Sequence, residues 1–168
     1  MDIQILPVPV EQAGVLENLM HLYLYDFSEY TNDDVDAQGR FIDEHLHLYW
    51  VEPGRYPFLI QVDGKQAGFV LVRQMIVEGE EAGGSPIHSI AEFFVMRKYR
   101  RNKVGQQAAW MIFDRFPGRW LVSEIPENLP AQAFWRRIIG EYTGGNYKEV
   151  QLPGWDGPTQ EFFNPAKA

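Results

Sequence analysis

Apolar side chains recur at helical spacing in the first part of the chain. Between residues 16 and 27 they fall at i, i+3, i+4, i+7, i+8 and i+11, which predicts an amphipathic helix after the short strand "IQILP". The polar, turn-rich stretch "TNDDVDAQGR" follows this helix. The next segment, "FIDEHLHLYW", predicts a second short helix, which "EPGRYP" ends.

Strand patterns dominate the middle of the chain, and helical spacing then returns twice. "FLIQV" and "QAGFVLVRQMI" flank an Asp63-Gly64 turn and predict a hairpin. After the loop "EGEEAGGSP", "IHSIAEFFVM" predicts a strand. A helix from Val104, the strand "RWLVSEI", a helix over 131–142 and the strands "YKEVQL" and "TQEFF" complete the chain. The predicted order is β-α-α-β-β-β-α-β-α-β-β, in one α+β, or mixed α/β, domain over residues 1–168.

Composition and charge exclude several classes of function. The chain has 168 residues, a formal net charge of −8 and no cysteine. The negative charge disfavours a nucleic-acid partner, and the lack of cysteine excludes disulfides, thiolate nucleophiles and cysteine zinc sites. The first residues lack the pattern of a signal peptide, and no apolar run approaches the roughly 20 residues that a bilayer needs. We therefore expect a cytoplasmic protein without a membrane partner.

A basic stretch, "YRRNKVGQQAAWMIF", lies where a predicted strand gives way to a predicted helix. A helix that begins near Lys103 presents unpaired N–H groups and the positive end of its dipole, which attract an anion. Gly105 lets a bulky group approach the backbone, so a diphosphate suits this place. The alternative is a solvated basic patch, because neither G-x-x-x-x-G-K-[ST] nor G-x-G-x-x-G occurs.

Two motifs resemble the signatures of the GNAT superfamily of acyl-CoA-dependent N-acetyltransferases. The first, [Q/R]-x-x-G-x-[G/A], fits Arg100 to Gly105 except that Lys103 replaces the middle glycine. A side chain there would strain a turn that needs positive φ, by about 1–2 kcal/mol. The second, N-x-x-A-x-x-F-[Y], fits Asn128 to Trp135 except at its last position. The resemblance implies a GNAT-like single domain with a central, mixed, mostly antiparallel twisted sheet of about six to seven strands and about four flanking helices.

The resemblance also implies acetyl-CoA as the acetyl donor. Its pyrophosphate would meet backbone N–H groups of the basic turn, and its pantetheine arm would pair with strand backbone in the manner of an added strand. Asn128 would help to hold the CoA arm, although an ordinary helix cap explains it equally well. The expected cofactor-binding residues are Phe94, Val95, Met96, Arg100, Arg101, Asn102, Lys103, Val104, Gly105, Gln106 and Asn128. No metal is expected.

Acetyl transfer to a primary amine needs a base, because only about one amine in 2,500 is neutral at pH 7. Glu92 is the predicted general base: it shares a strand face with Phe94 and Met96, whose apolar surroundings would raise its pKa. It also lies eight residues before Arg100, where the family often has an acidic residue. A salt bridge to an arginine is the alternative role. Glu124 is a second, weaker candidate, or a solvent-facing carboxylate.

The proton donor for the leaving thiolate is open. Trp135 stands where the family often has a tyrosine, and an indole does not donate a proton to a thiolate. Tyr142 and Tyr147 match no family position, and water could suffice because the thiol pKa is about 8.5. A backbone N–H near Val95 would polarise the thioester carbonyl.

Acidic and aromatic residues gather in "YDFSEYTNDDVD", and histidines in "HLHLYW". Acidic and aromatic groups together suit a cationic amine, but the acidic run also fits a solvated loop. His45 and His47 would face different ways on a helix, so we assign them no metal. His88 is either a proton carrier or a satisfied strand histidine.

Three classes of function fit these observations. The leading one is an N-acetyltransferase that moves the acetyl group of acetyl-CoA to a primary amine of a small-molecule or amino-acid-like acceptor, by direct attack with general-base assistance. The second is a non-catalytic CoA- or metabolite-binding module on the same fold. The third is an interaction protein that forms a homodimer through Trp155, Phe162 and Phe163, unless these residues close the core.

Overall fold

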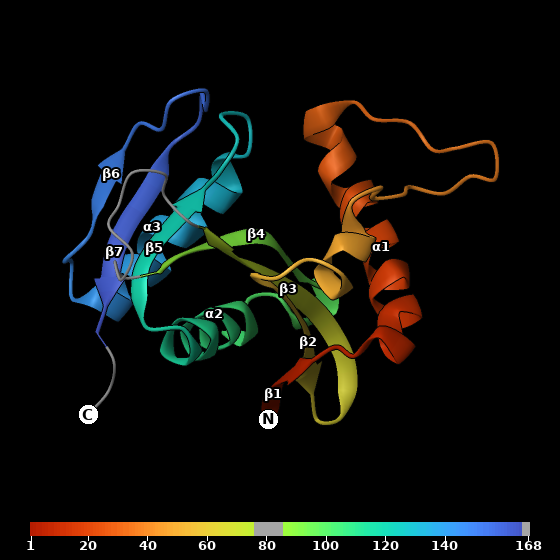
Figure 1. The fold of residues 1–168 in the computed structure, drawn as a ribbon, viewed down its shortest axis with the longest axis horizontal. Coiled ribbons are helices and arrows are strands. Elements are labelled where there is room, and N and C mark those ends of the chain that lie inside the picture. The colour runs from red at the N-terminus through yellow and green to blue at the C-terminus, as the bar shows by residue number, and fades with distance from the viewer. Residues whose placement is uncertain (76–85, 166–168) are drawn as a thin grey trace. The chain divides into compact units, whose positions relative to one another are not determined.

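A computed structural model describes residues 1–75 and 86–165 of the chain (Figure 1). The predicted loop "EGEEAGGSP" lies almost entirely outside the described residues. The strands are β1 (Ile3–Pro7), β2 (Arg55–Val62), β3 (Lys65–Met75), β4 (Ile87–Val95), β5 (Gly118–Ser123), β6 (Lys148–Val150) and β7 (Thr159–Asn164). The α-helices are α1 (Ala13–Thr31), α2 (Val104–Arg115) and α3 (Leu129–Thr143), with 3-10 helices at Val10–Gln12, Leu46–Trp50 and Arg97–Tyr99.

The strands form one mixed sheet in the order β1-β2-β3-β4-β5-β7-β6. β4 and β5 run parallel, whereas β1 with β2, β5 with β7, and β6 with β7 run antiparallel. This arrangement confirms the predicted α+β fold with its mixed sheet of six to seven strands. The number of helices is a correction, since the described residues hold three α-helices where about four were expected.

The predicted second helix is a 3-10 helix of five residues, Leu46–Trp50. Its start is set by Asp43, whose side chain accepts a hydrogen bond from the His45 N–H at 2.8 Å. Such a local side-chain bond competes with the α-helical ladder. The five residues that remain are too few to offset the cost of starting an α-helix.

The chain divides into two compact units. Met1–Leu71 and Glu92–Gly105 form the first, called here the N-terminal unit, and Val72–Ala91 and Gln106–Ala168 form the second, the C-terminal unit. β3 and β4 each contribute residues to both units. The prediction of one domain over the whole chain stays a prediction.

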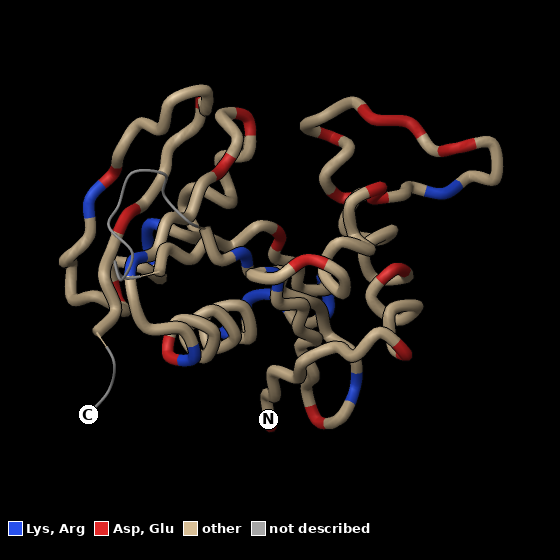
Figure 2. Tube along the Cα trace, viewed as in Figure 1, with Lys and Arg blue, Asp and Glu red and all other residues tan. Residues whose placement is uncertain are grey.

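In the N-terminal unit, α1 buries the apolar stripe that its sequence spacing predicts. Leu16, Leu19 and Met20 are buried, as are Ile60 of β2 and Phe69 of β3. The helix ends where Asn32 adopts a left-handed conformation, with φ of 59°, and donates its N–H to the Ser28 carbonyl. The segment after the helix carries the acidic run (Figure 2).

Strands β3 and β4 approach each other closely at Gly68. A Cβ atom at this position would collide with the backbone carbonyl oxygen of Phe94. The Met96 N–H donates to the Ala67 carbonyl at 2.8 Å next to this point. Glycine is therefore the residue that the backbone of β4 requires here.

Aromatic rings fill the core of the C-terminal unit. Trp120 of β5 is fully buried, and its ring lies 5.0 Å from that of Phe113 and 6.3 Å from that of Phe162. Phe162 is only 3% exposed, so it belongs to the core and not to the surface that a homodimer through aromatic residues would use. Trp155 and Phe163 are 36% and 60% exposed.

Candidate active site

Glu92 lies on β4 in the N-terminal unit and is half-buried. Its carboxyl oxygen Oε2 accepts a short hydrogen bond from the hydroxyl group of Tyr23 on α1. Burial raises the pKa of Glu92 to about 7, the Tyr23 hydrogen bond acts to lower it, and the negative charge of Asp43 raises it further. The expected effect of burial is confirmed, and the bonding partner is a tyrosine instead of the arginine of the alternative reading.

Tyr23 is held in an aromatic cluster. Its ring lies 5.5 Å from the rings of Phe27 and Phe69 and 5.8 Å from that of Phe94. Burial first, and then the charge of Glu92, raise the pKa of Tyr23 well above its ordinary value, so its hydroxyl group stays protonated. Sequence reasoning assigned Tyr23 to the apolar face of the helix and missed this role.

One turn after Tyr23, Asp26 binds two arginines. Its carboxylate oxygens lie 2.6 Å from Nη2 of Arg97 and 2.5 Å from Nη2 of Arg100. Burial acts to raise the pKa of Asp26, but the hydrogen bonds from Arg100 and Arg97 hold it below its ordinary value. Asp26 is therefore ionised, and the two arginines compensate its negative charge. That charge is then not available to attract a cationic amine.

Arg100 contacts the protein at two places. Besides Asp26, its Nε donates to the carbonyl oxygen of Val95 at 2.7 Å. In this arrangement the guanidinium group ties the end of β4 to α1. These two bonds use two of the five N–H donors of the guanidinium group, and the direct phosphate contact of Arg100 stays a prediction.

The turn between β4 and α2 has an unusual backbone. Arg101 and Lys103 adopt positive φ angles of 66° and 60°, and Asn102 between them does not. The strain expected for a side chain at Lys103 is thus present. Alternation of this kind can turn successive N–H groups toward one side and form a nest for an anion. The side chains of Arg101, Asn102 and Lys103 are exposed.

The structure brings most of the predicted site residues into the N-terminal unit. Glu92, the apolar strand end at 94–96 and the basic turn at 100–105 all belong to it. Phe94 and Val95 are buried, Met96 is half-buried, and Val104 at the start of α2 is fully buried.

Gln106 and Asn128 belong to the C-terminal unit. The Gln106 side chain donates to Glu141 at 3.0 Å. Asn128 accepts the Ala131 N–H at 3.1 Å and thereby caps α3. The helix-cap interpretation of Asn128 is confirmed, and its contact with CoA stays a prediction.

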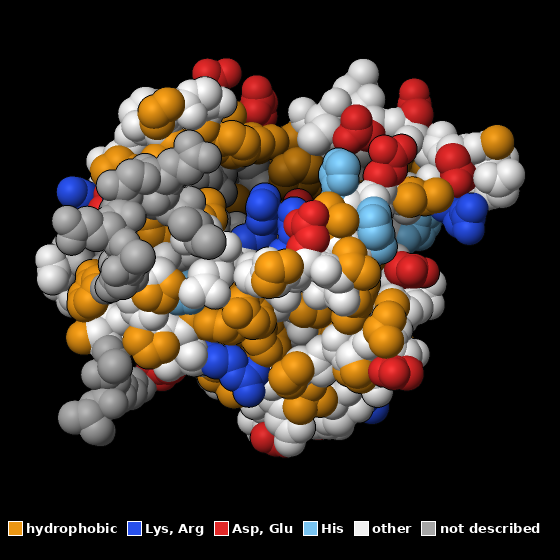
Figure 3. Space-filling model, viewed as in Figure 1, with side chains coloured by type: hydrophobic (Ala, Val, Ile, Leu, Met, Phe, Trp, Pro, Cys, Tyr) orange, Lys and Arg blue, Asp and Glu red, His pale blue; other side chains and the backbone are white. Residues whose placement is uncertain are grey.

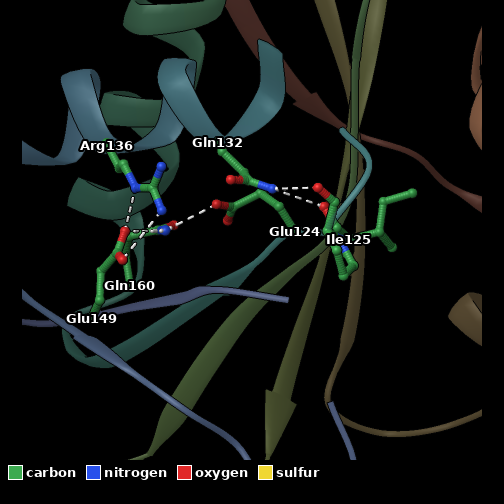
Figure 4. A network of polar contacts seen from close by, with 7 residues as sticks. Glu124, Ile125, Gln132, Arg136, Glu149 and Gln160 are labelled. Atoms are coloured by element: carbon green, nitrogen blue, oxygen red, sulfur yellow. Dashed lines mark hydrogen bonds and ion pairs between the residues drawn. The ribbon is translucent and has the colours of Figure 1, made fainter. Parts of the chain in front are cut away.

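Glu124 directly follows β5 in the C-terminal unit and is only 4% exposed. The reading as a solvent-facing carboxylate was therefore wrong. Gln160 donates to Glu124 Oε1 at 2.9 Å, and to Glu149, which also binds Arg136 (Figure 4). Burial raises the pKa of Glu124 to about 8. Its other oxygen, Oε2, has no hydrogen-bond partner among the described residues.

The histidines contribute no metal site in the part of the chain that the structure describes. His88 is buried between the rings of Phe116 and Trp120, at 5.2 and 5.3 Å, and burial lowers its pKa. Its Nδ1 has no hydrogen-bond partner within residues 1–75 and 86–165. His88 is therefore a buried strand histidine whose hydrogen bonding is incomplete in these ranges. His45 and His47 are exposed.

The surface beside α1 is both apolar and acidic. Figure 3 shows hydrophobic side chains next to histidine and acidic side chains over the segment that follows the helix. Val35 and Ile42 are 46% and 57% exposed there, and Asp33 and Asp34 are also exposed. The acidic run is therefore solvated, as its alternative reading proposed.

None of the helices in the described ranges is long and apolar enough to cross a bilayer.

Comparison with known proteins identifies the family. The sequence model of the acetyltransferase (GNAT) family matches residues 16–140. The chain therefore belongs to the GNAT acetyltransferase family, whose members use acetyl-CoA as the acetyl donor. No curated protein gives a significant match.

Solved structures support the same fold. An acetyltransferase from Thermus thermophilus is similar at 16% identity and a TM-score of 0.64, over 97% of each chain. An aminoglycoside acetyltransferase from an uncultured soil metagenomic sample, in complex with sisomicin, has 16% identity and a TM-score of 0.66, over 92% of this chain and 94% of that one. The Escherichia coli ribosomal-protein-S18-alanine N-acetyltransferase has 9% identity and a TM-score of 0.60, over 99% and 97%.

Proposed function

We propose that this protein transfers the acetyl group of acetyl-CoA to the primary amine of a small-molecule or amino-acid-like acceptor, with Glu92 as the general base. The observation that carries the proposal is the half-buried Glu92 carboxyl, which binds the Tyr23 hydroxyl group and whose pKa of about 7 lets it accept a proton near neutral pH. An acidic, cysteine-free chain suits the reducing cytoplasm, where we place this activity.

The N-terminal unit supplies groups that fit acetyl-CoA. The nest-like turn from Arg101 to Lys103 offers backbone N–H groups to the pyrophosphate, and the exposed Lys103 ammonium adds positive charge. The apolar end of β4 at 94–96 suits the pantetheine arm, with a backbone N–H near Val95 to polarise the thioester carbonyl. Gln106 and Asn128 stay predicted contacts of the CoA arm.

Glu92 then takes the proton that the attacking nitrogen must lose. About 10²- to 10⁴-fold in rate is the usual contribution of such a base. The rings of Phe27, Phe69 and Phe94 lie next to the ring of Tyr23, whose hydroxyl group binds Glu92. These apolar surroundings favour an acceptor in which the amine is carried on an apolar or aromatic group. The names of similar enzymes support testing both aminoglycosides and peptides with N-terminal alanine as acceptors.

Calorimetric titration of acetyl-CoA tests the first half of this proposal. The wild type should bind acetyl-CoA, and Lys103→Ala should weaken binding about tenfold, a loss of about 1.4 kcal/mol. Lys65→Ala removes an exposed lysine from the start of β3 and is the matched control, with unchanged affinity. Absence of binding to the wild type would overturn the proposal.

An amine panel tests the second half. CoA release from acetyl-CoA is followed with aromatic amines, polyamines, aminoglycosides and peptides with N-terminal alanine. Release that depends on one class of amine supports the enzyme. Tight acetyl-CoA binding without release by any amine would favour the non-catalytic CoA-binding module instead.

A further inference from the structure

Acetyl transfer needs a proton at the departing sulfur as well as a base at the amine. The family position for that acid holds Trp135, which is 6% exposed. Its ring lies 5.0 Å from Phe134 and 6.4 Å from Phe113 in the core of the C-terminal unit. An indole N–H is also far too weak an acid for this step, so the donor must be another group.

Tyr142, the tyrosine of α3, is directed elsewhere. Its hydroxyl group donates to Asp114 at 2.8 Å. Burial and this hydrogen bond raise the pKa of Tyr142 well above its ordinary value. Tyr142 therefore shares its proton with a carboxylate on α2.

Tyr23 has the connections that a proton donor requires. Its hydroxyl group is bonded directly to the carboxyl group that takes the amine proton. Its ring is fixed by an edge contact with Phe69, at an interplanar angle of 83°, and by Phe94 on β4. Phe94 immediately precedes Val95, where the thioester carbonyl is expected. The phenol thus lies beside both the base and the strand end assigned to the thioester.

We propose that Tyr23 donates its hydroxyl proton to the leaving CoA thiolate and regains a proton from Glu92. This inference rests on the proposed acetyltransferase function and adds its missing acid. Tyr23 becomes a catalytic residue, and Glu92 and Tyr23 act as one proton relay.

The relay balances in atoms and charge. The amine nitrogen forms a bond to the carbonyl carbon, and its proton passes to Glu92. The carbon–sulfur bond breaks with its electron pair on sulfur, and the Tyr23 proton passes to that sulfur. The proton on Glu92 then passes to the Tyr23 oxygen, so both side chains return to their starting states. The products are the N-acetylated amine and CoA with a free thiol.

The proton affinities make the net transfer favourable. A tyrosine, with an ordinary pKa of about 10, is a weaker acid than a free thiol such as that of cysteine, with a pKa of about 8.5. The Glu92 carboxyl has a pKa of about 7, so a proton that leaves Glu92 and ends on sulfur moves to the stronger base. Tyr23 serves as the bridge for that transfer.

Substitution of Tyr23 by phenylalanine tests the relay, because it keeps the ring and removes the proton. Steady-state rates of CoA release are measured at pH 9, where Glu92 is ionised in every variant. The acceptor is the amine of the panel with the highest kcat/KM. We expect kcat to fall at least tenfold in Tyr23→Phe with KM changed less than twofold. Tyr56→Phe, in β2 of the same unit, is the control and should keep the wild-type rate.

Fluorinated tyrosine gives a second readout that a structural role would not move. 3,5-Difluorotyrosine at position 23 restores an O–H of lower pKa. We expect this substitution to recover the kcat that Tyr23→Phe loses. We also expect kcat to fall at high pH, at a pH low enough to measure, because the fluorinated hydroxyl group loses its proton at a lower pH than tyrosine does.

The outcomes separate the two claims. The relay would be overturned if the kcat of Tyr23→Phe equalled that of the wild type at pH 9 and was lower only near neutral pH. That result would show that Tyr23 only positions Glu92. A wild type that releases no CoA with any amine would overturn the proposed function, and the relay with it. Circular dichroism of each variant checks that its fold is retained, and the fluorotyrosine protein provides the test if Tyr23→Phe does not fold.

Discussion

At the scale of single residues, the carboxyl of Glu92 and the hydroxyl of Tyr23 form one titrating pair. The two residues are 69 positions apart and meet because α1 packs beside β4 in the N-terminal unit. Burial is the largest cause of the raised pKa of Glu92, and Asp43 adds to it. The pKa of Glu92 is therefore set by burial, by the opposing hydrogen bond from Tyr23, and by the negative charge of Asp43.

The pH dependence of kcat/KM should report this pair. A base must be ionised, so kcat/KM should rise with pH through an apparent pKa of about 7 and then level off. Tyr23→Phe should move the rise to higher pH, because the Tyr23 hydrogen bond lowers the pKa of Glu92. Asp43→Asn should move it to lower pH. A profile unchanged in both variants would show that another group titrates.

The sequence predicted Glu92 but not Tyr23, for a physical reason. Strand alternation places Glu92 among apolar neighbours, so its perturbed pKa follows from local pattern alone. The ring of Tyr23 fits the apolar spacing of α1, and nothing in the neighbouring sequence indicates a partner for its hydroxyl group. Only the tertiary arrangement reveals that this hydroxyl group faces a carboxyl on β4.

At the scale of elements, the end of β4 and the turn after it organise the site. Gly68 on β3 lies against the Phe94 carbonyl, and Arg100 binds the Val95 carbonyl. The positive φ angles of Arg101 and Lys103 lead into α2. The path of the backbone from β4 to α2 is thus held by a close strand contact and by one arginine.

Gly68→Ala should destabilise the protein by about 1–3 kcal/mol, since the added Cβ collides with backbone and overpacks the site. Urea denaturation measures the change. Gly14→Ala is the matched control: its Cβ would meet nothing within 4 Å, and alanine in α1 should add about 0.5–1 kcal/mol of stability. Equal stability of Gly68→Ala and the wild type would contradict the close approach.

Helix and strand patterns predicted most elements, and the failures have local causes. The 3-10 helix at Leu46–Trp50 replaced a predicted helix because Asp43 bonds its neighbouring backbone. The strained turn at Lys103 could be predicted, since a family glycine position holds a side chain. The positive φ at Arg101 could not, because the motif accepts any residue there.

At the scale of the whole molecule, each unit holds a carboxyl with a raised pKa. Glu92 lies in the N-terminal unit and Glu124 in the C-terminal unit. In the unfolded chain both titrate near their ordinary value of 4.5. The folded protein therefore retains protons that the unfolded chain has lost, and the free energy of unfolding should fall as pH rises above 4.5.

Glu124 should contribute most of this fall between pH 7 and 8, because Glu92 is already about half ionised at pH 7. One retained proton gives a slope of at most about 1.4 kcal/mol per pH unit. Glu124→Gln should reduce the slope in this interval by more than half and leave the smaller contribution of Glu92, whereas the exposed Glu127→Gln should keep the whole slope. Urea denaturation at pH 7 and pH 8 measures both, and an unchanged slope in Glu124→Gln would contradict the assignment.

The order of elements and the family could be predicted from two short motifs together with hydrophobic spacing. The division into two compact units could not, because β3 and β4 run without interruption through both. Neither could the burial of Glu124, which depends on Gln160 of β7 and on the packing of the C-terminal unit.

The central claim is that Glu92 is the base of an acetyl-CoA-dependent acetyltransferase. The most direct measurement is the rate of CoA release at pH 8 by the wild type and Glu92→Gln, each saturated with acetyl-CoA and the best amine. We predict a fall in kcat of about 10²- to 10⁴-fold with unchanged acetyl-CoA affinity, while the exposed Glu17→Gln on α1 keeps the wild-type rate. A Glu92→Gln protein that turns over as fast as the wild type would contradict the claim.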